Sequence, residues 1–330
     1  MALVGTRKVG AALGGAALVV AAFAAGWLAR GGRESVPPPM RQIREAGLAP
    51  GRWINPLLEC EEAEAVLRRP ELRPFKHRLQ TLVDVRRTTG DIEFGSVYFR
   101  ELNDGSWVGV NEQVGYIPAS LLKLPVLISA LKRAEHDPAF LGRRVRFPGG
   151  RDLNEVMRFR PPVALESGAS YTVEELCTRS VRYSDNNATG LLSELIPVPE
   201  QERTLRGLGV LPEMLEARGK LNVKTVSAFF RVLYNASWLD RERSETALQM
   251  LSRSSFREGI VAGVPETVRV SSKYGEAALQ LRSYQLHEFA IVYHERRPYL
   301  LGVMSQGSDL ATMTRFIRDV SRAVYDEVDR

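Results

Sequence analysis

The chain is poor in the residues that crosslink proteins or bind metals. It has two cysteines, Cys60 and Cys177, and four histidines in 330 residues. Two cysteines cannot form a disulfide framework or a zinc site by themselves. A single bridge between them is one possibility, and Cys177 packed as a small apolar residue of a helix is another. The histidines form neither a His-x-His nor a His-Glu-x-x-His pattern, so we expect no metal and no other cofactor.

Strong charge of one sign and a nucleophile elbow are also missing. The net charge is +6, and no basic stripe is interleaved with aromatic residues, which argues against a nucleic-acid partner. The chain contains no Gly-x-Ser-x-Gly sequence, which argues against an α/β-hydrolase. With 44% hydrophobic and 25% charged residues, the composition is that of a globular protein with a sizeable core.

One long uncharged run stands at the amino end. Residues 9–29 contain no charge, and at about 1.5 Å per residue a helix of that length spans the roughly 30 Å hydrocarbon core of a membrane. An Ala-Phe-Ala sequence at 22–24 leaves a cleaved signal peptide open as the alternative. The full spanning length and Trp27 favour an uncleaved anchor. We therefore expect 1–30 to be a single-pass membrane anchor, with the rest extracytoplasmic, or secreted if the signal is cleaved.

The remaining sequence predicts an α+β domain. Residues 31–70, which include a run of three prolines, are expected to be a linker and arm. Helical patterns at 72–90 and near the carboxyl end flank strand-like runs, and the middle of the chain is mostly helical in pattern. The expected strands lie at 93–102, 106–111, 267–277, 287–294 and 298–307, and Asn103-Asp104-Gly105 between the first two predicts a hairpin.

Strands at both ends and helices between them indicate an antiparallel sheet flanked by terminal helices, with an inserted all-helical half. We assign 71–330 to this domain, with the sheet half at 71–115 and 262–330 and the helical half at 116–261. A functional site is expected in the crevice between the two halves.

Ser120 and Lys123 lie three residues apart within an apolar run. Near the start of a helix, residues at this spacing share a face, so the amine can reach the hydroxyl. A serine needs a base to become a nucleophile, and a lysine can be that base if burial and nearby positive charge lower its pKa. Backbone N–H groups at the helix start can also stabilise an oxyanion. The pattern recurs at Ser129 and Lys132, a copy that we interpret as accidental.

A second polar group, Ser184-Asp185-Asn186, lies between two helical patterns. All three residue types are good helix caps, and capping alone accounts for Asp185. The functional interpretation is that the serine relays a proton to a leaving group and the amide binds the substrate backbone.

A third motif places Lys273 and Gly275 on a predicted strand. A lysine that faces the crevice would bind a carboxylate, and the glycine would let another backbone approach. An extended ligand could then pair with this strand as an added one. The simpler alternative is an exposed lysine followed by a bulge glycine.

The three motifs follow one another in the order Ser-x-x-Lys, Ser-Asp-Asn and Lys-x-Gly. In this order, and over roughly residues 72–328, the chain resembles the class A β-lactamases and penicillin-binding serine enzymes. The resemblance implies a β-lactamase/transpeptidase-like fold and a β-lactam or peptidoglycan-like substrate. It also implies roles for individual residues: Ser120 as acylated nucleophile, Lys123 as its base, Ser184 as proton carrier, Asn186 and Lys273 as substrate-binding residues, and the backbone N–H groups of Ser120 and Glu276 as the oxyanion hole.

The chain departs from this family in two places. The family's Lys-Thr-Gly is Lys273-Tyr274-Gly275, and a tyrosine is bulkier and aims its hydroxyl elsewhere. The segment 209–225 is shorter than the family's deacylating loop and lacks its Glu-x-x-x-Asn pattern, although it contains Glu213 and Glu216. We therefore expect acylation followed by slow deacylation.

Three functions remain open at this point. The first is a membrane-anchored serine hydrolase that forms an acyl-enzyme with β-lactams or with peptidoglycan-like amides and esters. The second is a true β-lactamase that uses Glu213 or Glu216. The third is a non-catalytic sensor or scaffold that binds a cell-wall ligand. An intact nucleophile and base favour catalysis, because a pure binder needs neither.

Overall fold

The computed structural model describes residues 42–44, 52–60, 72–213, 215, 219–280 and 282–330. They belong to one compact unit, Met40–Arg330. The anchor expected at 1–30 and Glu216 lie outside the described residues, as does much of the expected linker. Within the described ranges, no helix has the length and apolar character needed to cross a membrane.

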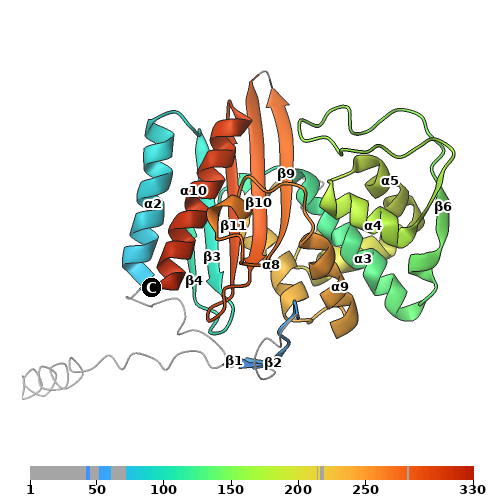
Figure 1. Ribbon diagram of the computed structural model, residues 1–330, viewed down its shortest axis with the longest axis horizontal. Coiled ribbons are helices and arrows are strands. Elements are labelled where there is room, and N and C mark those ends of the chain that lie inside the picture. Colours follow the sequence, from blue (N-terminus) through green and yellow to red (C-terminus); the bar gives the residue numbers. More distant parts are fainter. Residues whose placement is uncertain (1–41, 45–51, 61–71, 214, 216–218, 281) are drawn as a thin grey trace, which may run out of the picture. The chain divides into compact units, whose positions relative to one another are not determined.

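A five-stranded antiparallel sheet forms the centre of the fold (Figure 1). Its order is β4-β3-β11-β10-β9, so strands from both ends of the chain pair with each other and β9 lies at an edge. The first two strands join in the hairpin predicted from Asn103-Asp104-Gly105. The expected α+β class and the assembly of the sheet from both chain ends are confirmed. The strands are β3 Phe94–Glu101, β4 Trp107–Val110, β9 Val270–Gln280, β10 Ser283–Val292 and β11 Tyr299–Gly307.

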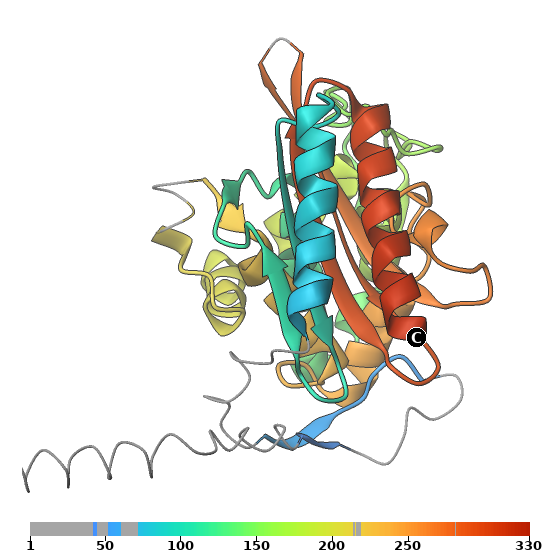
Figure 2. The ribbon, with the colours of Figure 1, turned by 90° about the vertical axis from the view of Figure 1, so that its left-hand side faces the viewer.

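Two helices cover one face of the sheet. These are α2 (Arg73–Thr88) and α10 (Leu310–Asp329), which lie side by side in Figure 2. Their apolar faces are buried in one cluster, to which Leu79 of α2 and Phe316 of α10 contribute. Burying each such side chain stabilises the fold by about 1.5–3 kcal/mol.

The helical half follows the first hairpin and lies beside the β9 edge (Figure 1). Its helices are α3 Lys123–His136, α4 Val173–Arg182, α5 Asn186–Leu195, α6 Val198–Gly207, α8 Val223–Tyr234 and α9 Arg241–Leu251. The short elements are η3 Ala119–Leu122, η4 Phe140–Gly142, η5 Val261–Gly263, β1 Gln42–Arg44 with β2 Leu57–Cys60, β5 Gly115–Tyr116 with β8 Leu221–Asn222, and β6 Arg144–Arg146 with β7 Ser170–Thr172.

The local sequence explains where the helices that carry the site begin. Thr172 and Glu175 form a reciprocal capping box at the start of α4, so two backbone donors of the first turn are satisfied.

Cys177 lies inside helix α4 as a free, fully buried thiol. Burial raises its pKa to about 12, so it packs as an apolar residue, as the sequence suggested.

The nucleophile segment differs from the expected single helix. Ser120 lies in the one-turn helix η3, and α3 begins only at Lys123. Pro125 has no backbone N–H to donate to the carbonyl of Leu121, and its ring clashes with an α-helical carbonyl at that position. The chain therefore takes a tighter turn around Ser120 before the regular helix starts.

Candidate active site

The turn that carries Ser120 is fixed to the sheet through Ile117. The Ile117 N–H donates to Gln285 Oε1 at 2.9 Å, and His287 Nε2 donates to the Ile117 carbonyl oxygen at 3.0 Å. Burial lowers the pKa of His287 to about 4, so this anchor stays uncharged at neutral pH. Ala119 then adopts a positive φ of 49°. This left-handed conformation costs a residue other than glycine about 1–2 kcal/mol. Strain is thus held directly before the half-buried Ser120.

Strand β9 passes close to this turn at Gly275. A Cβ atom at Gly275 would lie 3.2 Å from both the Leu121 nitrogen and the Pro118 oxygen. Only a residue without a side chain fits such a close backbone approach comfortably. The backbone at Gly275 therefore lies against the turn that carries Ser120.

Ser184 lies between two buried amines. Its Oγ accepts hydrogen bonds from Lys123 Nζ at 3.2 Å and from Lys273 Nζ at 3.0 Å. Lys123 also donates to the Ser184 carbonyl and, at 2.6 Å, to Asn186 Oδ1. In the described part of the chain, none of the Lys123 hydrogen bonds goes to Ser120. The structure thus brings together Lys123, Ser184, Asn186 and Lys273, which come from three separate motifs.

Burial weakens the basicity of both amines, and the charge of Lys123 weakens that of Lys273 further. Burial lowers the pKa of Lys123 to about 7, against the opposing effect of the Asp185 and Glu276 charges. Burial and the charge of Lys123 hold the pKa of Lys273 well below its ordinary value. The Lys123 amine can therefore exchange a proton near neutral pH, as a general base must.

The Ser184 turn is held by Asp185, which caps α5. One carboxylate oxygen accepts from the N–H groups of Asn187 and Ala188, at 3.0 and 3.2 Å. The other forms an ion pair with Arg179 at 3.0 Å. Ser184 itself has a φ of +58°. The expected capping role of Asp185 is present, and it fixes the strained residue that faces the two amines.

A loop that the sequence did not single out supports the same turn. Asn154 Oδ1 accepts from the Asn186 N–H at 2.7 Å, and Asn154 Nδ2 donates to Asp185 Oδ1 at 3.0 Å. The Leu153 carbonyl accepts from Asn186 Nδ2 at 2.9 Å. This loop follows neither a helical nor a strand period, so the pattern of residues contained no signal for it.

Glu276 and Tyr274 bind the far end of this loop to β9. Glu276 Oε1 accepts from the N–H groups of Arg158 and Phe159, each at 3.0 Å, and burial raises the pKa of this carboxyl. The Tyr274 hydroxyl donates to the Phe159 carbonyl at 3.2 Å, and its ring stacks on Phe256 at 4.8 Å. The tyrosine that replaces the family's threonine therefore makes a structural contact with this loop, and its hydroxyl also interacts with the Ser184 side chain.

The segment 209–225 was expected to match a deacylating loop. Its described residues provide no carboxylate to the cluster around Ser184. Glu213 is exposed and paired with Arg206, which holds the pKa of Glu213 below its usual value. Asn222 caps α8 by accepting from the Thr225 N–H at 2.9 Å. Both side chains thus have structural partners, and Glu216 lies outside the described residues.

The described residues contain no group of His, Cys, Asp and Glu side chains suited to a metal ion. What they do contain is a serine that follows a strained residue, a second serine between two buried amines, one of them with a pKa near neutrality, and a sheet edge that passes close to the first serine's turn. Fold and site together define a serine hydrolase of the β-lactamase-like superfamily.

Comparison with known proteins agrees with this class. The profile of the Beta-lactamase enzyme family matches residues 74–328, so the chain belongs to that family. A β-lactamase from Bacillus licheniformis is 25% identical over 242 residues, which cover 66% of this chain and 72% of that protein.

Solved structures share the fold at lower identity. A class A β-lactamase from Mycobacterium abscessus superposes with a TM-score of 0.64 at 20% identity, covering 76% of this chain and 100% of that one. PBP-A superposes with a TM-score of 0.64 at 18% identity, covering 78% and 97%. The β-lactamase/transpeptidase-like fold expected from the motifs is thereby confirmed.

Proposed function

We propose that this protein forms an acyl-enzyme on Ser120 with β-lactams or with peptidoglycan-like amides and esters. The Ser120 Oγ attacks the carbonyl carbon, and its proton passes to the neutral Lys123 amine. As the carbon–nitrogen bond breaks, Ser184 relays a proton from the amines to the leaving nitrogen. The observation that carries this proposal is the position of Ser184 Oγ, 3.2 Å from Lys123 Nζ and 3.0 Å from Lys273 Nζ.

The surrounding groups bind the substrate in this proposal. Lys273 and the Asn186 amide hold the substrate's carboxylate and backbone amide, and the N–H groups of Ser120 and Glu276 stabilise the oxyanion. Gly275 keeps the sheet edge open to an extended peptide. No metal or other cofactor takes part.

We also propose that the acyl-enzyme hydrolyses slowly. Deacylation needs a carboxylate that positions a water molecule, and Glu213 is exposed and paired with Arg206. One of the solved relatives is a variant of PBP-A described as an acyl-enzyme complex with penicillin G. That protein's trapped adduct supports the idea that this fold can acylate without rapid turnover.

The uncharged run at 9–29 supports placement outside the cytoplasmic membrane. We propose that 1–30 anchors the chain and that the domain at 71–330 is extracytoplasmic. Cell-wall peptides would then be within its reach.

The test is a time course of intact mass after addition of penicillin G. The proposal expects one adduct per chain that persists over hours and is absent from the Ser120→Ala variant. Loss of the drug without an accumulating adduct would instead identify an efficient β-lactamase. If neither an adduct nor hydrolysis of penicillin or a model ester is seen, the chain is a binding protein.

A further inference from the structure

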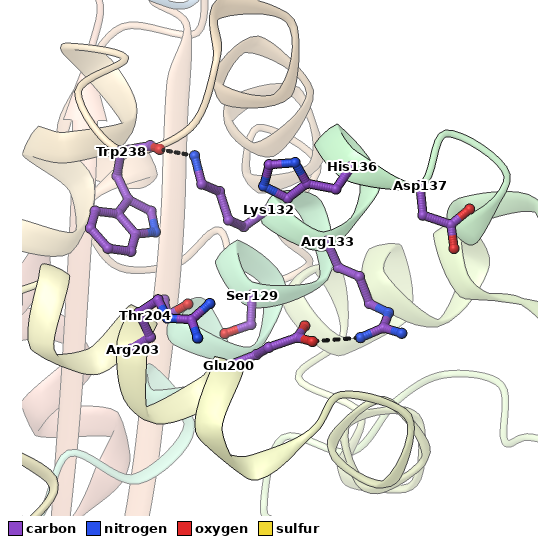
Figure 3. A pocket seen from close by; sticks show the side chains of 9 residues that line it. All are labelled: Ser129, Lys132, Arg133, His136, Asp137, Glu200, Arg203, Thr204 and Trp238. Atoms are coloured by element: carbon purple, nitrogen blue, oxygen red, sulfur yellow. Dashed lines mark hydrogen bonds and ion pairs between the residues drawn. The ribbon is translucent and has the colours of Figure 1, made fainter.

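A cavity on the far part of α3 is separate from the cluster around Ser184. It has a volume of about 440 Å³ and lies between α3, α6 and the connection from α8 to α9 (Figure 3). Two of its lining residues, Ser129 and Lys132, are the second Ser-x-x-Lys copy that the sequence analysis treated as accidental. The volume is within the range of about 300–1,000 Å³ typical of small-molecule sites.

The second Ser-x-x-Lys pair is not a second nucleophile and base. Lys132 Nζ donates to Glu135 and to the Trp238 carbonyl oxygen, each at 2.7 Å. Ser129 Oγ makes no hydrogen bond to any described residue, so the Lys132 amine is not placed to take its proton. Any role of the cavity is therefore one of binding.

Unpartnered donors are concentrated in its wall. Ser129 Oγ, Arg133 Nε and Trp238 Nε1 are buried and make no hydrogen bond to the described residues. Ser129 is only 2% exposed. Three buried donors without acceptors in one wall are costly unless a ligand or water supplies acceptor atoms.

The charges of the lining leave one cation without an ion pair. Glu200 is paired with Arg133 at 2.7 Å, and Asp137 is paired with Arg143 at 2.6 Å. Arg203 is exposed and forms no ion pair with any described residue, and Figure 3 shows its guanidinium directed into the cavity beside Ser129 and Trp238. One free guanidinium matches one planar, singly charged anion.

From this cavity, its unpartnered donors and the free guanidinium, we propose that the protein has a second binding site for a small molecule with a carboxylate group. The carboxylate pairs with Arg203 and accepts hydrogen bonds from the Ser129 hydroxyl and the Trp238 indole. The Trp238 ring packs against a flat apolar body. This site does not depend on the acylation chemistry of Ser120.

The test uses benzoate as the probe and the full chain with ¹⁵N-labelled tryptophan. The indole signal of Trp238, assigned with Trp238→Phe, should shift saturably as benzoate is added. Benzamide has the same shape without the charge and should not shift it. Arg203→Ala should weaken benzoate binding about tenfold or more, the loss expected for a charge-assisted pair, whereas Arg253→Ala, at an exposed arginine outside the cavity, should bind as the parent does.

Several results would overturn the proposal. No saturable shift with benzoate would mean that the cavity holds water alone. An equal response to benzamide, or unchanged benzoate affinity in Arg203→Ala, would mean that the cavity does not recognise a carboxylate. An equal response to inorganic phosphate would also overturn it, because the site would then be a general anion site.

Discussion

At the residue scale, the pKa of Lys123 controls the proposed chemistry. Burial lowers it to about 7, and only the neutral amine can accept the Ser120 proton. The rate constant of acylation should therefore be small below pH 6, rise through pH 7 and level off above it. Stopped-flow measurement of adduct formation with penicillin across this range tests the sign and the midpoint.

Lys123→Ala supplies the control for this profile. Loss of a general base typically costs about 10²–10⁴ in rate, and the rise near pH 7 should vanish with it. If the variant kept a rise with the same midpoint, another group would be the base.

Tyr274 offers a second test at a single residue. It is 1% exposed and packs against Phe159 and Phe256. Tyr274→Phe removes the hydrogen bonds of the hydroxyl, the one to the Phe159 carbonyl among them, but keeps the ring, and should lower the free energy of unfolding by about 1 kcal/mol. Tyr274→Thr restores the family residue but empties an aromatic site, and should cost about 3 kcal/mol or more.

Urea unfolding of the two Tyr274 variants measures both losses. Equal losses would mean that the ring contributes nothing and that the loop is held elsewhere. A faster acylation in Tyr274→Thr would separately show that the tyrosine limits substrate entry.

At the scale of the elements, two aspartate caps form a matched pair. Asp185 at the start of α5 is buried and paired with Arg179, and Asp240 at the start of α9 is exposed. Asp240→Ala should cost about 1 kcal/mol, the usual value of a cap. Asp185→Ala should cost about 3–5 kcal/mol, because it also leaves a partly buried arginine without its partner. Thermal unfolding of both variants gives the comparison, and similar losses would contradict a special role for the Ser184 turn.

Two glycines, one in the sheet and one outside it, supply another pair of substitutions to compare. A Cβ atom at Gly302 of β11 would lie 2.3 Å from the Phe289 ring on β10, whereas one at Gly142 would meet nothing within 4 Å. Gly302→Ala should therefore destabilise the sheet by about 1–3 kcal/mol, and Gly142→Ala should be neutral or stabilising. Urea midpoints of the two variants that coincide would contradict the packing of Phe289 against β11.

The sequence predicted the elements with a clear period better than the contacts between them. The helix expected at 72–90 is Arg73–Thr88, and the hairpin at Asn103-Asp104-Gly105 is present. The 3.6-residue and two-residue periods carry this information. The loop around Asn154 was missed, because its role depends on partners far away in the chain.

The candidate site was predicted in the same uneven way. Ser184 and Lys273 meet as their motifs implied, 89 residues apart in the chain. The side-chain role of Glu276, which holds the loop at Arg158 and Phe159, was not foreseen, because nothing near Glu276 in the sequence points to that loop.

On the scale of the whole molecule, the central sheet joins the two apolar clusters. Along β10, Phe289 and Ile291 belong to the cluster shared with the helical half, and Ala290 and Val292 to the cluster under α2 and α10. Because each strand contributes to both faces, neither half can unfold and leave the other intact. We expect circular dichroism and tryptophan fluorescence to report one urea transition with a single midpoint. Two separated midpoints would mean that the halves are independent domains.

Mapping of the acylated residue tests the central claim most directly. The full chain is incubated with penicillin G, quenched in acid, digested and sequenced by tandem mass spectrometry. We expect the penicilloyl group on Ser120 alone, with none on Ser184 or Ser129. A label on either of those serines, or an unlabelled chain, would contradict the account that Lys123 activates Ser120 beside the edge of β9.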